Sequence, residues 1–137
     1  MISKHSHKNK IRYLTPDQIL LTHSLIVDET TGSHGIRDRA SIASAVEQPK
    51  QMVFGKELYP TLFEKAAVYA RSIIMSHPFL DGNKRTGISV AIIFLEENRY
   101  TFVAEKRAIE KFALKIVHEH LEIPEIARWL EDHVKKL

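Results

Sequence analysis

The chain has 137 residues, of which 44% are hydrophobic and 27% charged, and its formal charge is +3 with the histidines neutral. This length and composition are typical of a single globular domain with a sizeable core. So small a charge does not by itself indicate binding to nucleic acid. The absence of cysteine excludes disulfides, thiolate zinc sites and cysteine catalysis.

No apolar run reaches the length needed to span a membrane, and the polar, basic N-terminus contains no apolar signal segment. We therefore expect a cytoplasmic protein that contacts neither a membrane nor, directly, nucleic acid. Residues 1–12 are expected to form a polar tail and residues 13–137 a single domain. His5 and His7 could bind a metal ion, but a disordered chain end is the stronger interpretation.

The first two predicted helices have clear start signals. Thr15 can cap the first, because Pro16 suits the first helical position and Gln18 completes a capping box. Apolar residues follow at helical spacing, and His23 lies among them. On such a stripe a histidine is more often a satisfied core residue than a ligand. Asp38 can cap a second, shorter helix.

The stretch 49–60 has neither a clear helical pattern nor a clear strand pattern. Met52, Val53 and Phe54 are apolar and favour extended structure, and Gly55 can form a turn. On these residues alone, the stretch reads as a surface loop that folds back onto the core.

The third predicted helix starts at the cap Thr61 and carries an apolar stripe whose next position is His77. Pro78 disfavours helix at the residue before it, so the helix ends at His77. This histidine would then be held by a core helix. A general base needs such rigid positioning.

Three more helices are predicted after this point. The one at 83–98 is apolar nearly all round and is expected to be the central buried helix. Another is expected at about 105–120. The last opens at Pro124 and should end near Lys135 and Lys136, which suit a helix C-terminus. The sequence thus predicts an all-α domain of about six helices.

The run 77–87, His-Pro-Phe-Leu-Asp-Gly-Asn-Lys-Arg-Thr-Gly, gathers several chemically active groups between two helices. A helix that begins near Asn83 would aim its free N–H groups at the preceding loop, an arrangement that favours a phosphate. Lys84 and Arg85 would add positive charge there.

Two further groups in this run suggest chemistry on that phosphate. A carboxylate beside phosphates, here Asp81, usually holds Mg²⁺. His77 can accept a proton near neutral pH. The alternative is a polar turn with a capping asparagine and solvated cations, which would suffice for any one of these residues. Their combination within nine positions favours a phosphoryl-type transfer.

The run resembles the signature of the Fic/Doc family, His-x-Phe-x-Asp/Glu-Gly/Ala-Asn-Gly/Lys-Arg. The resemblance extends from about Tyr13 to Thr101. It is closest to the Doc branch, the "death on curing" toxins, because Lys84 stands where AMP-adding Fic proteins usually carry glycine. It implies a Fic/Doc-like helical bundle with a flap between the second and third helices, which pairs with the target by strand-like contacts.

The resemblance also implies roles for residues. His77 would be the catalytic base and Asp81 the Mg²⁺ ligand. The phosphates would be bound by four consecutive residues, Gly82, Asn83, Lys84 and Arg85. The target would be positioned by the flap residues Met52, Val53, Phe54 and Gly55.

The activity that this implies is transfer of the γ-phosphate of ATP to a threonine of a translation factor such as elongation factor Tu, which halts translation. AMP transfer and a non-catalytic binding module are the alternatives, and physical reasoning alone does not separate phosphate from AMP transfer. Ile88 replaces the second arginine of many Fic enzymes, and the chain has no inhibitory Ser/Thr-x-x-x-Glu-Gly/Asn segment. A separate Phd-like antitoxin is therefore the implied restraint.

Overall fold

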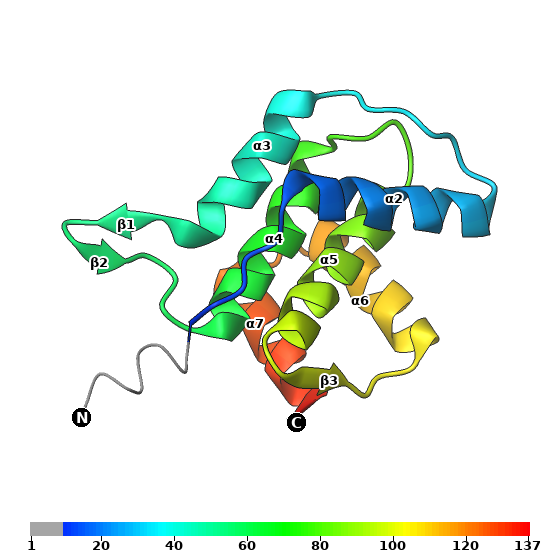
Figure 1. Ribbon diagram of the computed structural model, residues 1–137. Helices are drawn as coiled ribbons and strands as arrows, with labels where there is room; N and C mark the ends of the chain where they lie inside the picture. Colours follow the sequence, from blue (N-terminus) through cyan, green and yellow to red (C-terminus); the bar gives the residue numbers. More distant parts are fainter. Residues whose placement is uncertain (1–9) are drawn as a thin grey trace.

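A computed structural model of the protein describes residues 10–137, and six α-helices form most of it (Figure 1). These helices are α2 (Pro16–Thr30), α3 (Arg39–Glu47), α4 (Leu62–Ser76), α5 (Asn83–Glu97), α6 (Lys106–His118) and α7 (Ile123–Asp132), and a short 3₁₀ turn, η1 (Gln48–Lys50), follows α3. The prediction of a mainly helical domain with about six helices is confirmed. His5 and His7 lie outside the described residues.

The core is built around α4 and α5, which pack against each other while the other helices surround them (Figure 1). Tyr69 and Ile73 of α4 and Ile88 and Phe94 of α5 are fully buried. The capping box predicted at the start of α2 is present, and Thr61 forms another with Glu64 at the start of α4. No helix within residues 10–137 is both long and apolar enough to cross a membrane.

A small hairpin projects from the body of the domain between η1 and α4 (Figure 1). Its strands β1 (Met52–Val53) and β2 (Lys56–Glu57) pair antiparallel, and Phe54 and Gly55 form the turn. Both turn residues have positive φ, 51° and 77°. Two-residue hairpin turns of this kind match the twist of the flanking strands. This hairpin occupies the stretch expected to be a flap and is called the flap below.

The C-terminal end differs from the prediction. The last helix stops at Asp132, and β4 (Val134–Lys136) pairs antiparallel with β3 (Tyr100–Phe102). The expectation that Lys135 and Lys136 end a helix is therefore wrong. Long-range pairing overrides the local pattern, and lysine is common on exposed strand edges.

Candidate functional site

The loop between α4 and α5 is fixed from within by Asn83. This buried side chain accepts a hydrogen bond from the Phe79 N–H at 3.0 Å and donates one to the Phe79 carbonyl at 2.9 Å. Phe79 itself is 1% exposed and forms part of the core. Asn83 thus binds the loop rather than capping the helix, and it sets where α5 starts relative to α4.

A second segment of the chain holds the same loop from outside. The Leu80 N–H donates to the Gly35 carbonyl at 3.1 Å, and the Arg37 N–H donates to the Pro78 carbonyl at 2.7 Å. In Figure 1 the α2–α3 and α4–α5 loops run beside each other at the top of the molecule. The loop is therefore a paired, defined structure.

His77 caps the C-terminus of α4 and is exposed, with a left-handed backbone at φ 52°. Its Nδ1 lies 3.3 Å from the Met75 carbonyl oxygen. A carbonyl can only accept, so this contact favours the tautomer with the proton on Nδ1 and leaves Nε2 free to take one. The Arg37 guanidinium donates to the carbonyls of His77 and Ser76 at 2.7 and 2.6 Å, which fixes the end of the helix.

The Asp81 carboxylate is exposed, and backbone N–H groups orient it. Oδ1 accepts from the Gly82 N–H at 2.9 Å, and Oδ2 accepts from the Ser33 N–H at 3.3 Å. The Asp81 carbonyl bonds to Nε2 of buried His23 at 2.8 Å. His23 also stacks on Phe79, with 3.7 Å between ring centroids. His23 is thus a satisfied core histidine that supports the loop.

The carboxylate of Asp81 is chemically suited to hold Mg²⁺ beside phosphates. Residues 10–137 contain no cluster of three or more His, Asp or Glu side chains that could hold a metal ion by themselves. Mg²⁺ typically takes one or two carboxylates, and substrate phosphates and waters complete its shell. The single carboxylate of Asp81 meets that requirement.

The start of α5 offers backbone donors to an anion. Gly82 is the N-cap residue with φ 77°, and no side chain among the described residues caps this helix. The first-turn N–H groups therefore lack acceptors within the helix, and the positive end of the helix dipole faces the loop. The Lys84 side chain, in the first turn, is exposed. These features suit a phosphate group.

Arg85 contacts carboxylates on two other helices, α2 and α6, and no pattern in the sequence predicts either contact. Its Nη2 lies 3.3 Å from Glu29 on α2, and its Nη1 lies 3.9 Å from Glu110 on α6. Lys106 also approaches Glu29, at 4.0 Å. The guanidinium is thereby oriented, and an incoming phosphate has to share it with carboxylates.

The flap residues stand apart from this run. Met52, Val53, Phe54 and Gly55 are all exposed on the hairpin. Among the hydrogen bonds within residues 10–137, none joins them to the stretch 77–85. The structure brings together the predicted base, metal ligand and phosphate-binding residues around one loop, and it places the predicted target-binding residues on a separate arm.

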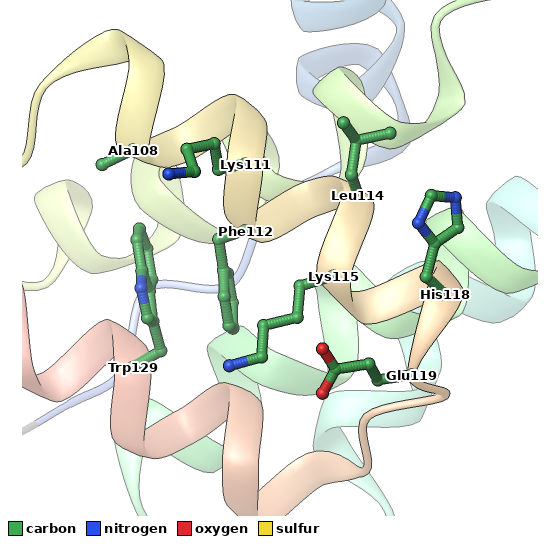
Figure 2. A pocket seen from close by; sticks show the side chains of 8 residues that line it. All are labelled: Ala108, Lys111, Phe112, Leu114, Lys115, His118, Glu119 and Trp129. Carbon is green, nitrogen blue, oxygen red and sulfur yellow. The ribbon is translucent and has the colours of Figure 1, made fainter.

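The hollow drawn in Figure 2 lies elsewhere on the molecule, on α6 and α7. It is floored by Phe112 and Trp129, which stack at 4.1 Å, and edged by Lys111 and Lys115. It shares no residue with the stretch 77–85. A different hollow, of ≈ 400 Å³, reaches from the base of the flap to the last turn of α4.

A histidine at the end of one core helix and the uncapped start of the next, joined by a short loop, characterise this helical domain. Residues 13–95 match the sequence model of the Fic/DOC family. The chain belongs to this family.

Two curated relatives are similar over about two thirds of the chain. Toxin Doc of Mycolicibacterium smegmatis is 33% identical over 93 residues, 68% of this chain and 69% of that protein. Protein kinase doc of Escherichia phage P1 is 27% identical over 88 residues, 64% of this chain and 69% of that protein.

Proposed function

We propose that the protein is a Doc-type toxin kinase. It transfers the γ-phosphate of ATP to a hydroxyl, a threonine in our proposal, of a translation factor such as elongation factor Tu, and so halts translation in the cytoplasm. The names of the two relatives, a toxin and a protein kinase, support the reaction class. Lys84 supports phosphate transfer over AMP transfer, because the resemblance to Doc proteins is closest at that residue.

The observation that carries this proposal is the geometry of His77. Its ring is exposed at the rigid end of α4, and the contact of Nδ1 with the Met75 carbonyl leaves Nε2 available as a base. The uncapped start of α5 follows only a short loop later. A proton acceptor and an anion cradle are thus held on two packed helices.

In the proposed reaction, Nε2 of His77 takes the proton of the acceptor hydroxyl as its oxygen bonds to the γ-phosphorus. The bond from that phosphorus to the β–γ bridging oxygen breaks, and ADP leaves. General-base assistance of this kind is worth ~10²–10⁴ in rate. Lys84, Arg85 and the first-turn N–H groups stabilise the charge on the phosphate oxygens. Asp81 would hold Mg²⁺, which supplies neutralising charge at the phosphates when bound.

We propose that restraint comes from a Phd-like antitoxin supplied as a separate protein. The name of one relative is that of a toxin, and a toxin that persists in a cell needs an inhibitor. The sequence contains no Ser/Thr-x-x-x-Glu-Gly/Asn segment that could restrain the site from within.

Intact-mass measurement tests the activity. The purified protein is incubated with ATP, Mg²⁺ and elongation factor Tu, and we expect the factor to gain the mass of one phosphate. His77→Ala should abolish the gain, whereas His34→Ala should not. His34 is an exposed histidine that bonds to Asp28 at 2.7 Å and lies outside the proposed machinery, so it is a matched control.

Other outcomes identify the alternatives. A gain of a whole nucleotide would show AMP transfer instead. No modification by the wild type, or equal modification by His77→Ala, would remove the kinase proposal. Growth arrest that persists in the His77→Ala variant would favour a non-catalytic binding module on the same scaffold.

A further inference from the structure

Lys65 is a fully buried lysine near the start of α4, one of the two helices at the centre of the core. It lies in the first turns of α4 and is 0% exposed. Its Nζ donates to the Glu57 carboxylate at 2.6 Å and also to the Tyr59 carbonyl. Lysine is almost never fully buried unless it is paired, because removing its charge from water is costly. An apolar side chain would fill the same space without that cost, so the structure uses this lysine for its contacts.

Both partners of Lys65 belong to the base of the flap. Glu57 ends β2, and Tyr59 follows it on the way back to α4. Between these two residues, the Leu58 N–H donates a hydrogen bond to the Gln51 carbonyl at 2.9 Å, which closes the hairpin at its base. A hairpin with two-residue strands is at best marginally stable by itself. The contacts of Lys65 therefore connect an intrinsically weak arm to the rigid core.

The anchored base of the flap forms one side of a hollow that reaches Ser76, the last residue of α4. This hollow of ≈ 400 Å³ is lined by Gln48 and Tyr59 on the flap side and by Ser72, Met75 and Ser76 in the last turns of α4. The next residue after that turn is His77. An extended segment that lies along this hollow would bring its own side chains to the proposed base.

We propose that Lys65 is a positioning residue for the acceptor protein. It fixes Glu57 and Tyr59, so that the flap and the hollow beside it present the acceptor segment to His77. This inference rests on the proposed function, because it requires a protein acceptor that reacts at His77. The anchoring of the flap by Lys65 can be tested without any acceptor.

Hydrogen exchange of the flap amides is the first measurement, on the full chain without nucleotide. Lys65→Met keeps the side-chain length and removes the donors, and Glu57→Gln removes the charge from the flap side. Glu57 is 44% exposed, so Glu57→Gln removes no core side chain and keeps an oxygen that can accept from Lys65; it is the test variant if Lys65→Met fails to fold. Lys56→Met is the matched control, because Lys56 is an exposed lysine on the same strand. We expect the Leu58 amide to exchange about tenfold faster or more in both test variants, and at the wild-type rate in the control.

Kinetics with elongation factor Tu as the acceptor are the second measurement. We expect KM for the factor to rise about fivefold or more in Glu57→Gln and Lys65→Met, with KM for ATP unchanged. A purely structural role would alter both constants or neither. Unchanged exchange of Leu58 in folded Glu57→Gln overturns the inference, and so does a rise in KM for ATP alone. If wild type leaves the factor unmodified while exchange responds as expected, the anchor stands and the proposed function fails.

Discussion

Asn83 organises the loop before α5 by binding both backbone groups of Phe79, at 3.0 and 2.9 Å, in a buried environment. Alanine at this position leaves those groups without partners, which costs about 1–3 kcal/mol. We expect Asn83→Ala to lower the free energy of unfolding by that amount. We also expect weaker ATP binding, because the loop and the start of α5 lose their fixed relation. Urea unfolding and calorimetric titration with ATP measure the two effects.

Asn98 provides the matched control for that substitution at the opposite end of the same helix. It also binds both backbone groups of one residue, accepting from the Arg12 N–H at 2.9 Å and donating to the Arg12 carbonyl at 3.0 Å. Asn98→Ala should lower stability while leaving ATP affinity unchanged. Equal loss of ATP affinity in both variants would show that Asn83 acts only through global stability.

The Arg85 guanidinium is paired with carboxylates, and a bound phosphate would compete with them. Glu29 lies 3.3 Å from its Nη2 and is 64% exposed, so the pair is screened by water and worth at most about 1 kcal/mol. We expect Glu29→Gln to tighten ATP binding up to about fivefold, because a charge that repels the phosphates and competes for Arg85 is removed. Calorimetric titration with ATP gives the affinity.

Asp17→Asn on the same helix serves as the comparison for Glu29→Gln. Asp17 lies in the first turn of α2, far along the helix from Glu29, and should leave the affinity for ATP unchanged. Weaker ATP binding by Glu29→Gln would mean that this glutamate holds Arg85 in place for the nucleotide rather than competing with it.

At the level of elements, local signals made the helices predictable, whereas long-range pairing did not show in the sequence. The caps Thr15, Asp38 and Thr61 are where the sequence placed them, since a cap and its partner lie within a few residues. The sequence predicts a helix end where β4 lies, because the pairing of β4 with β3 joins segments more than thirty residues apart along the chain. Each strand has only three residues, which is too short for alternation to identify it.

The turn of the flap is strained for the residue that occupies it. Phe54 is fully exposed and has φ 51°, a conformation that asparagine adopts much more readily. We expect Phe54→Asn to leave the thermal midpoint unchanged or slightly higher, because Asn-Gly is the preferred sequence for such a turn. If the flap recognises the acceptor, KM for elongation factor Tu should rise at the same time.

A thermal melt and steady-state kinetics separate these two effects in Phe54→Asn. Val103→Asn is the comparison, because Val103 is another exposed apolar residue, 50% exposed, and lies outside both the flap and the stretch 77–85. An unchanged KM for elongation factor Tu in Phe54→Asn would show that the turn does not contribute to acceptor recognition, whatever the thermal midpoint.

At the scale of the whole molecule, the contiguous part of the site was predictable and its supports were not. His77, Asp81 and Arg85 lie within nine residues, so their chemistry could be inferred before the fold was known. Arg37 and Glu29 are brought to them from forty or more residues away by the packing of α2 and the following loop against α4 and α5. No local pattern marked either residue. The free Nε2 of His77 likewise depends on a backbone carbonyl whose position only the folded helix end defines.

Tyr69 ties the N-terminal segment to the centre of the domain and makes the fold sensitive to alkali. Its hydroxyl accepts a hydrogen bond from the Leu14 N–H at 3.0 Å within the core. Burial raises the pKa of Tyr69 to about 12, from the usual 10.0. The folded state therefore holds this proton more tightly than the unfolded chain does. The resulting stability is complete below pH 10 and is lost as the pH rises from 10 through 12.

Comparison of the wild type with Tyr69→Phe isolates this contribution. Near neutral pH the variant should be less stable by about 1 kcal/mol, because the Leu14 N–H loses its buried acceptor. Since phenylalanine does not ionise, the stability difference between the two proteins should shrink as the pH rises above 10, when only the wild type must retain a proton that its unfolded chain releases. Urea unfolding of both proteins across this range measures the difference. A difference that stays constant up to the alkaline limit would mean that Tyr69 ionises in the folded protein as readily as in the unfolded chain, and that the hydroxyl is not sealed in the core.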